Sequence, residues 1–213
     1  MLISGDMQSY AIADWEDPIK CAKAEEEITS ILTYAESICP NVFYIPGNHD
    51  PPDLFNNNDI RVPSLIKKGP DDSNEEKQLK ENCTNVHGKI VNIAKGLKLV
   101  GYGGSKDNLV KKDGEVIDTI WEAYPYKDEE DYSVGLKSLF SKLSHEYSLT
   151  KDFQVIVMTH IGPHNSPSAI DKTHLDEDGH IYSGSKALEY ILEQHKNFIV
   201  CNVHGHNHDS EKF

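Results

Sequence analysis

Side chains that can bind metal ions follow each of the apolar stretches that the sequence predicts to be buried strands. They are a carboxylate, an amide and several imidazoles, namely Asp6, Asn48, His49, His160, His206 and His208. A single histidine after a strand is more often packed or exposed than a ligand, but chance does not easily repeat the pattern at the end of every such stretch. Carboxylate, amide oxygen and imidazole together suit divalent manganese, iron or zinc. The sequence therefore predicts a metal centre.

The elements that must position these residues alternate between strand and helix. Apolar stretches at 1–4, 42–45, 154–159 and 197–203 indicate strands, and helical patterns lie between them. A strand, a helix and a second strand in succession favour parallel pairing. Functional groups gather at the carboxyl ends of the strands in such a sheet, so residues from the whole chain can converge there.

Three helices are expected. Asp17 is a plausible N-cap, and Pro18 suits the first helical position. The spacing predicts that one face of this helix is buried, through Ile28, Ile31, Leu32, Ala35 and Ile38. A second helix carries Leu136, Leu139, Phe140, Leu143 and Tyr147, and a third packs through Ala187, Leu188, Ile191 and Leu192.

The remaining segments predict a hairpin and two surface insertions within one domain, residues 1–213. Residues 85–105 read as two strands joined by a turn around Lys95 and Gly96. The polar stretches 51–84 and 105–131 are expected to be surface insertions, the first with one or two helical turns.

Composition excludes several classes of protein. The net charge of −14 argues against binding to nucleic-acid backbones or anionic membranes. We find no apolar run long enough for a membrane helix and no signal peptide. The four cysteines lack any C-x-x-C pairing, which favours reduced thiols and a cytoplasmic location.

The ordered motifs resemble those of the calcineurin-like metallophosphoesterases. They are Gly5-Asp6, Gly47-Asn48-His49-Asp50, the histidine His160 after an apolar strand, and Gly205-His206-Asn207-His208. The resemblance spans nearly the full chain, and the ordered set is far more specific than any member of it. It implies an α/β/β/α sandwich of two mixed sheets flanked by helices. It also implies hydrolysis of a phosphate-ester small molecule by a metal-activated water.

The resemblance also implies a role for each residue. Asp6 would bridge two divalent metal ions, manganese, iron or zinc. Asn48, His160 and His206 would complete one site, and His208 would bind the other ion together with Asp6. His49 would act beside the phosphate, as an acid to the leaving group or as a contact to a phosphoryl oxygen.

The sequence departs from the family pattern at its start. Family members begin with a strand that ends in D-x-H, about thirty or more residues before the G-D motif, and this stretch is absent. We therefore expect an incomplete chain that lacks the first and last strands of the fold. Such a chain is expected to bind about one metal ion, with little hydrolysis.

A second departure concerns the substrate. Phosphoprotein phosphatases of the superfamily clamp the phosphate with two arginines, whereas here Pro46 takes the first position and Arg61 is the only arginine. Ser9 stands where those enzymes carry an aspartate that orients the catalytic histidine. The pattern favours a phosphodiester or a small phosphomonoester, so both phosphodiesterase and phosphatase activity fit.

Two nearby polar residues have less defined roles. Asp50 is expected to hold its loop rather than to bind metal. His164 is expected to contact substrate or to support a ligand. Two alternatives to an enzyme stay open: a scaffold that has kept the fold and lost the chemistry, or a binder of a single metal ion without turnover.

Overall fold

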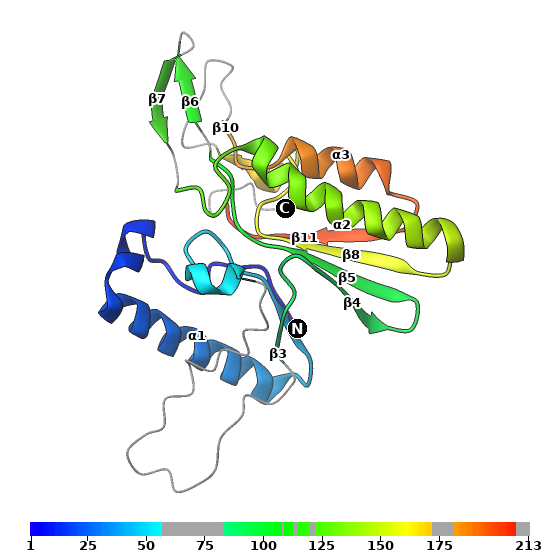
Figure 1. Ribbon diagram of the computed structural model, residues 1–213, viewed down its shortest axis with the longest axis horizontal. Helices are drawn as coiled ribbons and strands as arrows, with labels where there is room; N and C mark the ends of the chain where they lie inside the picture. The colour runs from blue at the N-terminus through cyan, green and yellow to red at the C-terminus, as the bar shows by residue number, and fades with distance from the viewer. Residues whose placement is uncertain (57–82, 108, 113–114, 120–121, 172–180, 208–213) are drawn as a thin grey trace, which may run out of the picture.

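Two β-sheets lie face to face between helices, in the part of the chain that the computed structural model describes (Figure 1): residues 1–56, 83–107, 109–112, 115–119, 122–171 and 181–207. Helix α1, Pro18–Ile38, covers the outer face of one sheet. Helices α2, Glu129–Thr150, and α3, Lys186–Gln194, cover the outer face of the other. This arrangement confirms the predicted α/β/β/α sandwich.

The first sheet contains β1, Leu2–Ile3, then β2, Val42–Tyr44, then β3, Cys83–Asn85, all parallel. β1, α1 and β2 form the strand-helix-strand unit that the sequence predicted. β3 was not predicted, because its three residues show no apolar alternation and adjoin a polar stretch. In the structure Cys83 and Thr84 pair with β2, whereas the sequence pattern placed them in a surface insertion.

The second sheet has the order β11-β8-β5-β4. Strands β11, Ile199–Val203, β8, Gln154–Thr159, and β5, Leu97–Tyr102, are parallel. Strand β4, Lys89–Ala94, pairs antiparallel with β5, so the sheet is mixed. The connecting turn contains Gly96 at φ +72°, which confirms the predicted hairpin.

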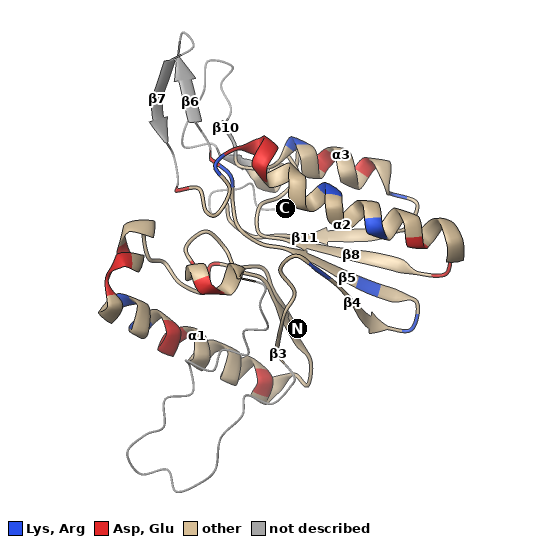
Figure 2. Cartoon of the chain, viewed as in Figure 1, with Lys and Arg blue, Asp and Glu red and all other residues tan. Residues whose placement is uncertain are grey.

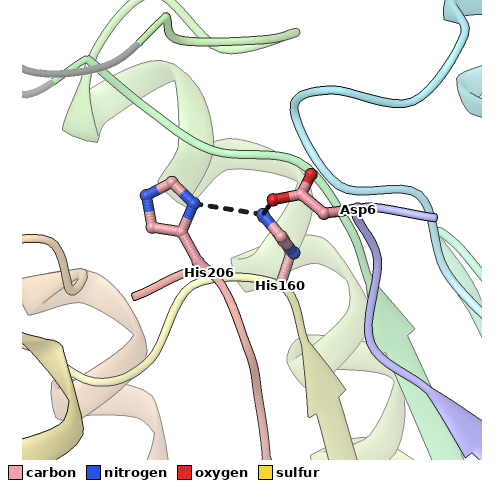
Figure 3. Close-up of side chains that lie close together, drawn as sticks. All are labelled: Asp6, His160 and His206. Carbon is pink, nitrogen blue, oxygen red and sulfur yellow. Dashed lines mark hydrogen bonds and ion pairs between the residues drawn. The ribbon is translucent and has the colours of Figure 1, made fainter. Parts of the chain in front are cut away.

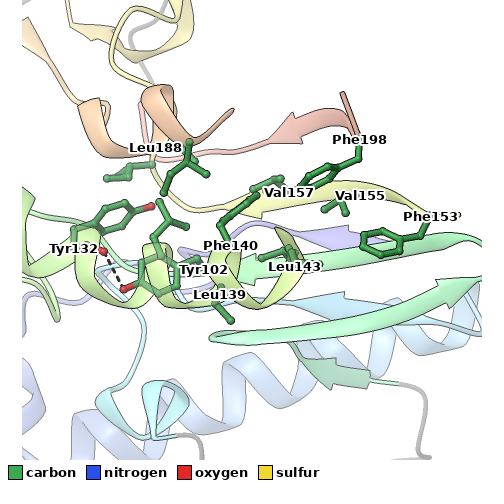
Figure 4. Packing of buried hydrophobic residues seen from close by; sticks show 14 residues of the cluster. Tyr102, Tyr132, Leu139, Phe140, Leu143, Phe153, Val155, Val157, Leu188 and Phe198 are labelled. Carbon is green, nitrogen blue, oxygen red and sulfur yellow. Dashed lines mark hydrogen bonds between the residues drawn. The ribbon is translucent and has the colours of Figure 1, made fainter. Parts of the chain in front are cut away.

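Alternate residues of each strand face different layers, which fills the core on both sides of each sheet. Val42 and Tyr44 of β2 pack against α1, whereas Ile45 just after it packs against the second sheet. In β8, Val155 and Val157 pack under α2 and α3, and Met158 faces the first sheet. Figure 4 shows the packing beneath α2 and α3, where the predicted Leu136, Leu139, Phe140, Leu143, Leu188 and Ile191 are buried.

Helix α1 buries a narrower face than the sequence predicted. Ile28, Leu32 and Ala35 are buried, but Ile31 is 38% and Ile38 is 58% exposed. The buried stripe also contains Ala24, so its centre lies on the line from Ala24 to Ile28 and Leu32. The two exposed isoleucines lie at the edge of that stripe, where the helix surface turns away from the sheet.

The insertion predicted at 105–131 includes an antiparallel pair, β6, Leu109–Lys112, and β7, Glu115–Thr119. A second short pair is formed by β9, Ile170–Asp171, and β10, Ile181–Tyr182. The other predicted insertion contains a 3₁₀ turn, Pro52–Phe55, and residues 57–82 lie outside the described part.

Acidic residues recur along α1 and cluster at the start of α2 (Figure 2). Asp128 caps α2 by accepting a hydrogen bond from the backbone N–H of Asp131 at 2.8 Å. Negative charge at a helix N-terminus is favourable, which explains the acidic residues 128–131 without a metal ion. Among the described residues, no helix combines the length and apolar content that a membrane span requires.

Candidate metal centre

The carboxyl ends of four strands, two from each sheet, meet at one edge of the sandwich. Asp6 and Asn48 follow β1 and β2 of the first sheet, and His160 and His206 follow β8 and β11 of the second. Figure 3 shows Asp6, His160 and His206 turned toward one another. One potential ligand atom from each of these three residues lies within 4.8 Å of the others, a spacing that can hold a metal ion.

The Nε2 atom of His160 is the centre of this group. It lies 2.9 Å from Oδ1 of Asn48, 3.2 Å from Oδ2 of Asp6 and 3.1 Å from Nδ1 of His206. His160 and Asn48 are fully buried, at 0% exposure. The structure therefore brings four of the predicted ligands to one point.

The tautomer of His160 follows from its second ring nitrogen. Nδ1 lies 2.8 Å from the carbonyl oxygen of Ser4, which can only accept a hydrogen bond. Nδ1 must therefore carry a proton, and in the neutral ring Nε2 presents a lone pair. That lone pair faces the oxygens of Asn48 and Asp6, so the group is stable only with a positive charge among these atoms.

The orientation of the Asn48 amide is also determined by a neighbour. Its Nδ2 atom donates to the backbone carbonyl of Glu122 at 3.0 Å. The carbonyl has no proton to donate, so the amide nitrogen must lie on that side and the oxygen must face His160. Oxygen is the amide atom that binds divalent ions.

The pKa values of Asp6 and His160 move in opposite directions. Burial alone would raise the pKa of Asp6, but the hydrogen bond and charge of His160, with the N–H of His49, lower it below its usual value. Burial alone would lower the pKa of His160, but Asp6 raises it. A proton on His160 can thus supply the positive charge that a metal ion would otherwise supply.

Two glycines allow the loops of the two sheets to approach. A Cβ on Gly47 would lie 2.1 Å from Oδ1 of Asp6, and a Cβ on Gly5 would lie 2.6 Å from Nδ1 of His160. Gly5 also has φ +96°, a conformation that side chains disfavour. The glycines of the G-D and G-N-H-D motifs are therefore steric requirements of the cluster.

Asp6 and His206 themselves adopt positive φ angles, +52° and +74°. Residues other than glycine rarely adopt this conformation, and those that do concentrate at functional sites. In His206 it turns the ring toward His160, and the backbone N–H of the preceding Gly205 donates to the carbonyl of His160 at 3.0 Å.

His49 and Asp50 lie beside the cluster without joining it. The backbone N–H of His49 donates to Oδ1 of Asp6 at 3.1 Å, and its ring Nδ1 lies 2.9 Å from the carbonyl of Tyr10. The buried Asp50 accepts from the N–H groups of Gly47 and Gln8, at 2.8 and 3.1 Å. Burial raises the pKa of Asp50 to about 7 despite these bonds.

Other histidines among the described residues lie outside this group. His164 is not in the cluster, and its backbone N–H donates to the carbonyl of Ser185 at the start of α3. His204 lies with its Nε2 atom 3.1 Å from the hydroxyl of Ser168. His208 lies outside the described residues.

Sequence reasoning missed the backbone groups that orient the cluster. The carbonyls of Ser4, Tyr10 and Glu122 each fix one side chain of the site. Any residue type supplies a carbonyl, so residue identities carry no signal for them. Only the fold, which places these carbonyls beside the motif residues, could show their role.

Comparisons with known proteins agree with this geometry. The chain matches the calcineurin-like phosphoesterase family over residues 1–210. It therefore belongs to that family of metal-dependent phosphoesterases. The donor set of Asp6, Asn48, His160 and His206 fits a divalent ion, as the family implies.

Two solved structures are similar to this chain at low sequence identity. One crystal structure shares the fold and is 11% identical with a TM-score of 0.52, covering 93% of this chain and 63% of that one. The crystal structure of TT1561 of Thermus thermophilus is 17% identical with a TM-score of 0.41, covering 92% and 64%. The chain thus spans less than two thirds of both. No curated protein matches it.

Proposed function

We propose that this protein hydrolyses a phosphate ester with the help of a divalent metal ion held by Asp6, Asn48, His160 and His206. One observation carries the proposal: lone pairs from an amide oxygen, a carboxylate and imidazole nitrogens converge within hydrogen-bonding distance of Nε2 of His160. A proton can bridge two of these atoms at a time, whereas a metal ion accepts all of them as ligands. The geometry is therefore better suited to a cation than to a hydrogen-bond network.

The donor types support manganese, iron or zinc. One carboxylate among neutral donors leaves net positive charge on a bound divalent ion, and such an ion attracts phosphate, activates water near neutral pH and stabilises charge on the phosphoryl oxygens. Asp6 and His208 are the residues we propose for a second ion. The burial of His160 and Asn48 excludes bulk water from one side of the site.

His49 is the residue that we propose to act on the substrate. Its Nδ1 atom contacts the carbonyl of Tyr10, so Nδ1 carries a proton and Nε2 is the atom available for proton transfer or for binding a phosphoryl oxygen. Its backbone N–H holds Asp6 at the same time. His49 would thus hold the metal ligand Asp6 through its backbone and act on the substrate through its ring.

The substrate class follows from the shortage of arginine. The only arginine, Arg61, lies outside the described residues, and Pro46 precedes the G-N-H-D motif. Ser9, which stands where phosphoprotein phosphatases of the superfamily carry an aspartate, is exposed. We therefore favour a phosphodiester or a small phosphomonoester over a phosphoprotein, and the net charge of −14 disfavours nucleic-acid backbones.

A comparison of three substrates tests the proposal. With Mn²⁺ present, bis-p-nitrophenyl phosphate or a small nucleotide should be hydrolysed faster than a phosphopeptide, and a chelator should abolish the reaction. Metal binding without hydrolysis of any of them would support a single-metal binder. A protein that binds no metal and still captures partner proteins would support a scaffold.

A further inference from the structure

Glu122 contacts three segments of the site, although no motif includes it. Its backbone carbonyl accepts hydrogen bonds from Nδ2 of Asn48 at 3.0 Å and from the hydroxyl of Ser105 at 3.5 Å. Its carboxylate accepts from the backbone N–H of Ile12 at 2.5 Å. Glu122 therefore joins the loop after β2, the loop after β5 and the segment after β1.

The carbonyl contact controls which end of the Asn48 amide faces the cluster. An amide is nearly symmetric in shape, so packing alone distinguishes its oxygen from its nitrogen poorly. With the Glu122 carbonyl in place, a flipped amide would bring two oxygens together. It would also direct at Nε2 of His160 an N–H₂ group, which cannot act as a metal ligand. The carbonyl therefore favours the orientation that binds a cation.

The carboxylate contact fixes the segment that orients His49. Ile12 begins a 3₁₀ helix, Ile12–Glu16, whose first N–H groups need acceptors from outside the helix. Two residues earlier, the carbonyl of Tyr10 contacts Nδ1 of His49 at 2.9 Å. By holding Ile12, the Glu122 side chain keeps that carbonyl near His49 and also anchors its own backbone beside Asn48.

We propose that Glu122 is a positioning residue of the metal centre, which acts through Asn48 and His49. The inference rests on the proposed function, in that Asn48 must bind the ion through its amide oxygen. Glu122 is itself exposed, so it contributes little to the core, and the contacts above are what its side chain supplies.

Two substitutions at Glu122 and one control test the role. Glu122→Ala should weaken Mn²⁺ binding about 10-fold or more, as loss of a partner that supports a ligand typically does, and should lower kcat more than it raises KM for bis-p-nitrophenyl phosphate. Glu122→Gln keeps an oxygen acceptor for Ile12 and should bind Mn²⁺ nearly as the native protein does. Glu16→Ala removes an exposed glutamate from the far end of the same 3₁₀ helix and should leave Mn²⁺ affinity unchanged.

The donor side of the same contact offers a second pair of variants. Ile12→Pro and Ile12→Ala both remove the isoleucine side chain, but only proline removes the N–H that Glu122 accepts. Proline suits a first helical position, and Ala11 before it is already extended, at φ −74° and ψ 153°. Ile12→Pro should therefore reproduce the loss of Mn²⁺ affinity, while Ile12→Ala should not. This pair decides the matter even if Glu122→Ala fails to fold.

A change at Asn48 separates positioning from general stability. In Asn48→Asp the two carboxylate oxygens are equivalent, so the side chain can be flipped without changing the atom that faces the ion. Glu122→Ala should therefore cost much less Mn²⁺ affinity in the Asn48→Asp protein than in the native protein. Equal losses in both backgrounds, or native affinity in Glu122→Ala and Ile12→Pro, would overturn the proposal. If all variants bind Mn²⁺ as expected but none hydrolyses a phosphate ester, the proposed function fails and the positioning role stands.

Discussion

The Nε2 atom of His160 lies 2.9 Å from the Oδ1 atom of Asn48, although 112 residues separate the two in the chain. The contact joins the second sheet to the first. The other polar atom of each side chain is occupied by a backbone carbonyl, of Ser4 for His160 and of Glu122 for Asn48. Both residues therefore direct a lone pair at the same point, which is the property that a metal ligand needs.

Replacing His49 should separate chemistry from metal binding. His49→Ala removes the ring that we assign to the substrate but keeps the backbone N–H that holds Asp6. General acid–base help is typically worth about 10²–10⁴-fold, so kcat should fall by that order while metal content stays nearly the same. Single-turnover assays beside elemental analysis of the purified variant measure both. Loss of the metal from the variant would instead make His49 a ligand.

A methyl group at Gly47 should disrupt the cluster. In Gly47→Ala the new Cβ would lie 2.1 Å from Oδ1 and 2.4 Å from the backbone nitrogen of Asp6, so that Asp6 must move. Overpacking of this kind typically costs about 1–3 kcal/mol, and Asp6 would leave its place beside His160. We expect lower stability in thermal unfolding and weaker metal binding.

Gly205→Ala is the matched control for that change. A Cβ there would lie 3.1 Å from the hydroxyl of Ser4, a side chain that can move, and 3.7 Å from the Ser4 carbonyl oxygen, which is ordinary contact. The loss of stability should therefore be smaller than at Gly47. Equal metal affinity in Gly47→Ala and the native protein would contradict the close approach of the two loops.

His87 should make the fold sensitive to acid. Burial lowers its pKa from the usual 6.5 to about 4, and Nδ1 accepts a hydrogen bond from the N–H of Gly103 at 2.9 Å. The folded state favours the neutral ring. The contribution of neutral His87 to the free energy of unfolding is therefore complete above pH 6.5 and is lost as the pH falls toward 4. The linkage is worth at most about 3 kcal/mol.

A comparison with His87→Gln isolates that effect. Glutamine offers an acceptor for Gly103 but does not titrate, and groups common to both proteins cancel in the difference. Denaturant unfolding between about pH 7.5 and 4.5 should show the native protein losing more free energy of unfolding than the variant. Parallel pH dependences would show that His87 is not held neutral by the fold.

The sequence predicted the strands and helices that carry long apolar patterns. It did not predict features that depend on contacts between elements distant in the chain. β8 was predicted at its observed bounds because five apolar or β-branched residues, 155–159, follow Gln154 without a break. β3 was missed, since pairing with β2 rather than residue type makes Cys83–Asn85 a strand. The exposure of Ile31 and Ile38 depends on how much of α1 the first sheet covers, which no pattern within the helix specifies.

The candidate site shows the same division. Side chains with ligand chemistry at strand ends could be named from the sequence because parallel strands share a carboxyl edge. The orientation of those side chains could not, because it depends on the carbonyls of Ser4, Tyr10 and Glu122. His164 illustrates the limit: its place in the sequence predicts a contact with substrate or support of a ligand, its backbone N–H donates to the carbonyl of Ser185 at the start of α3, and the role of its side chain stays a prediction.

Calorimetric titration of the native protein and of His160→Ala with Mn²⁺ and Zn²⁺ tests the central claim most directly. His204→Ala is the control, because His204 lies near the cluster but contacts Ser168. The account predicts that the native protein and His204→Ala bind an ion with similar affinity. His160→Ala should lose more affinity than the ~10–100-fold typical of residues that only support a ligand. Native affinity in His160→Ala would contradict the assignment of this cluster as the metal centre.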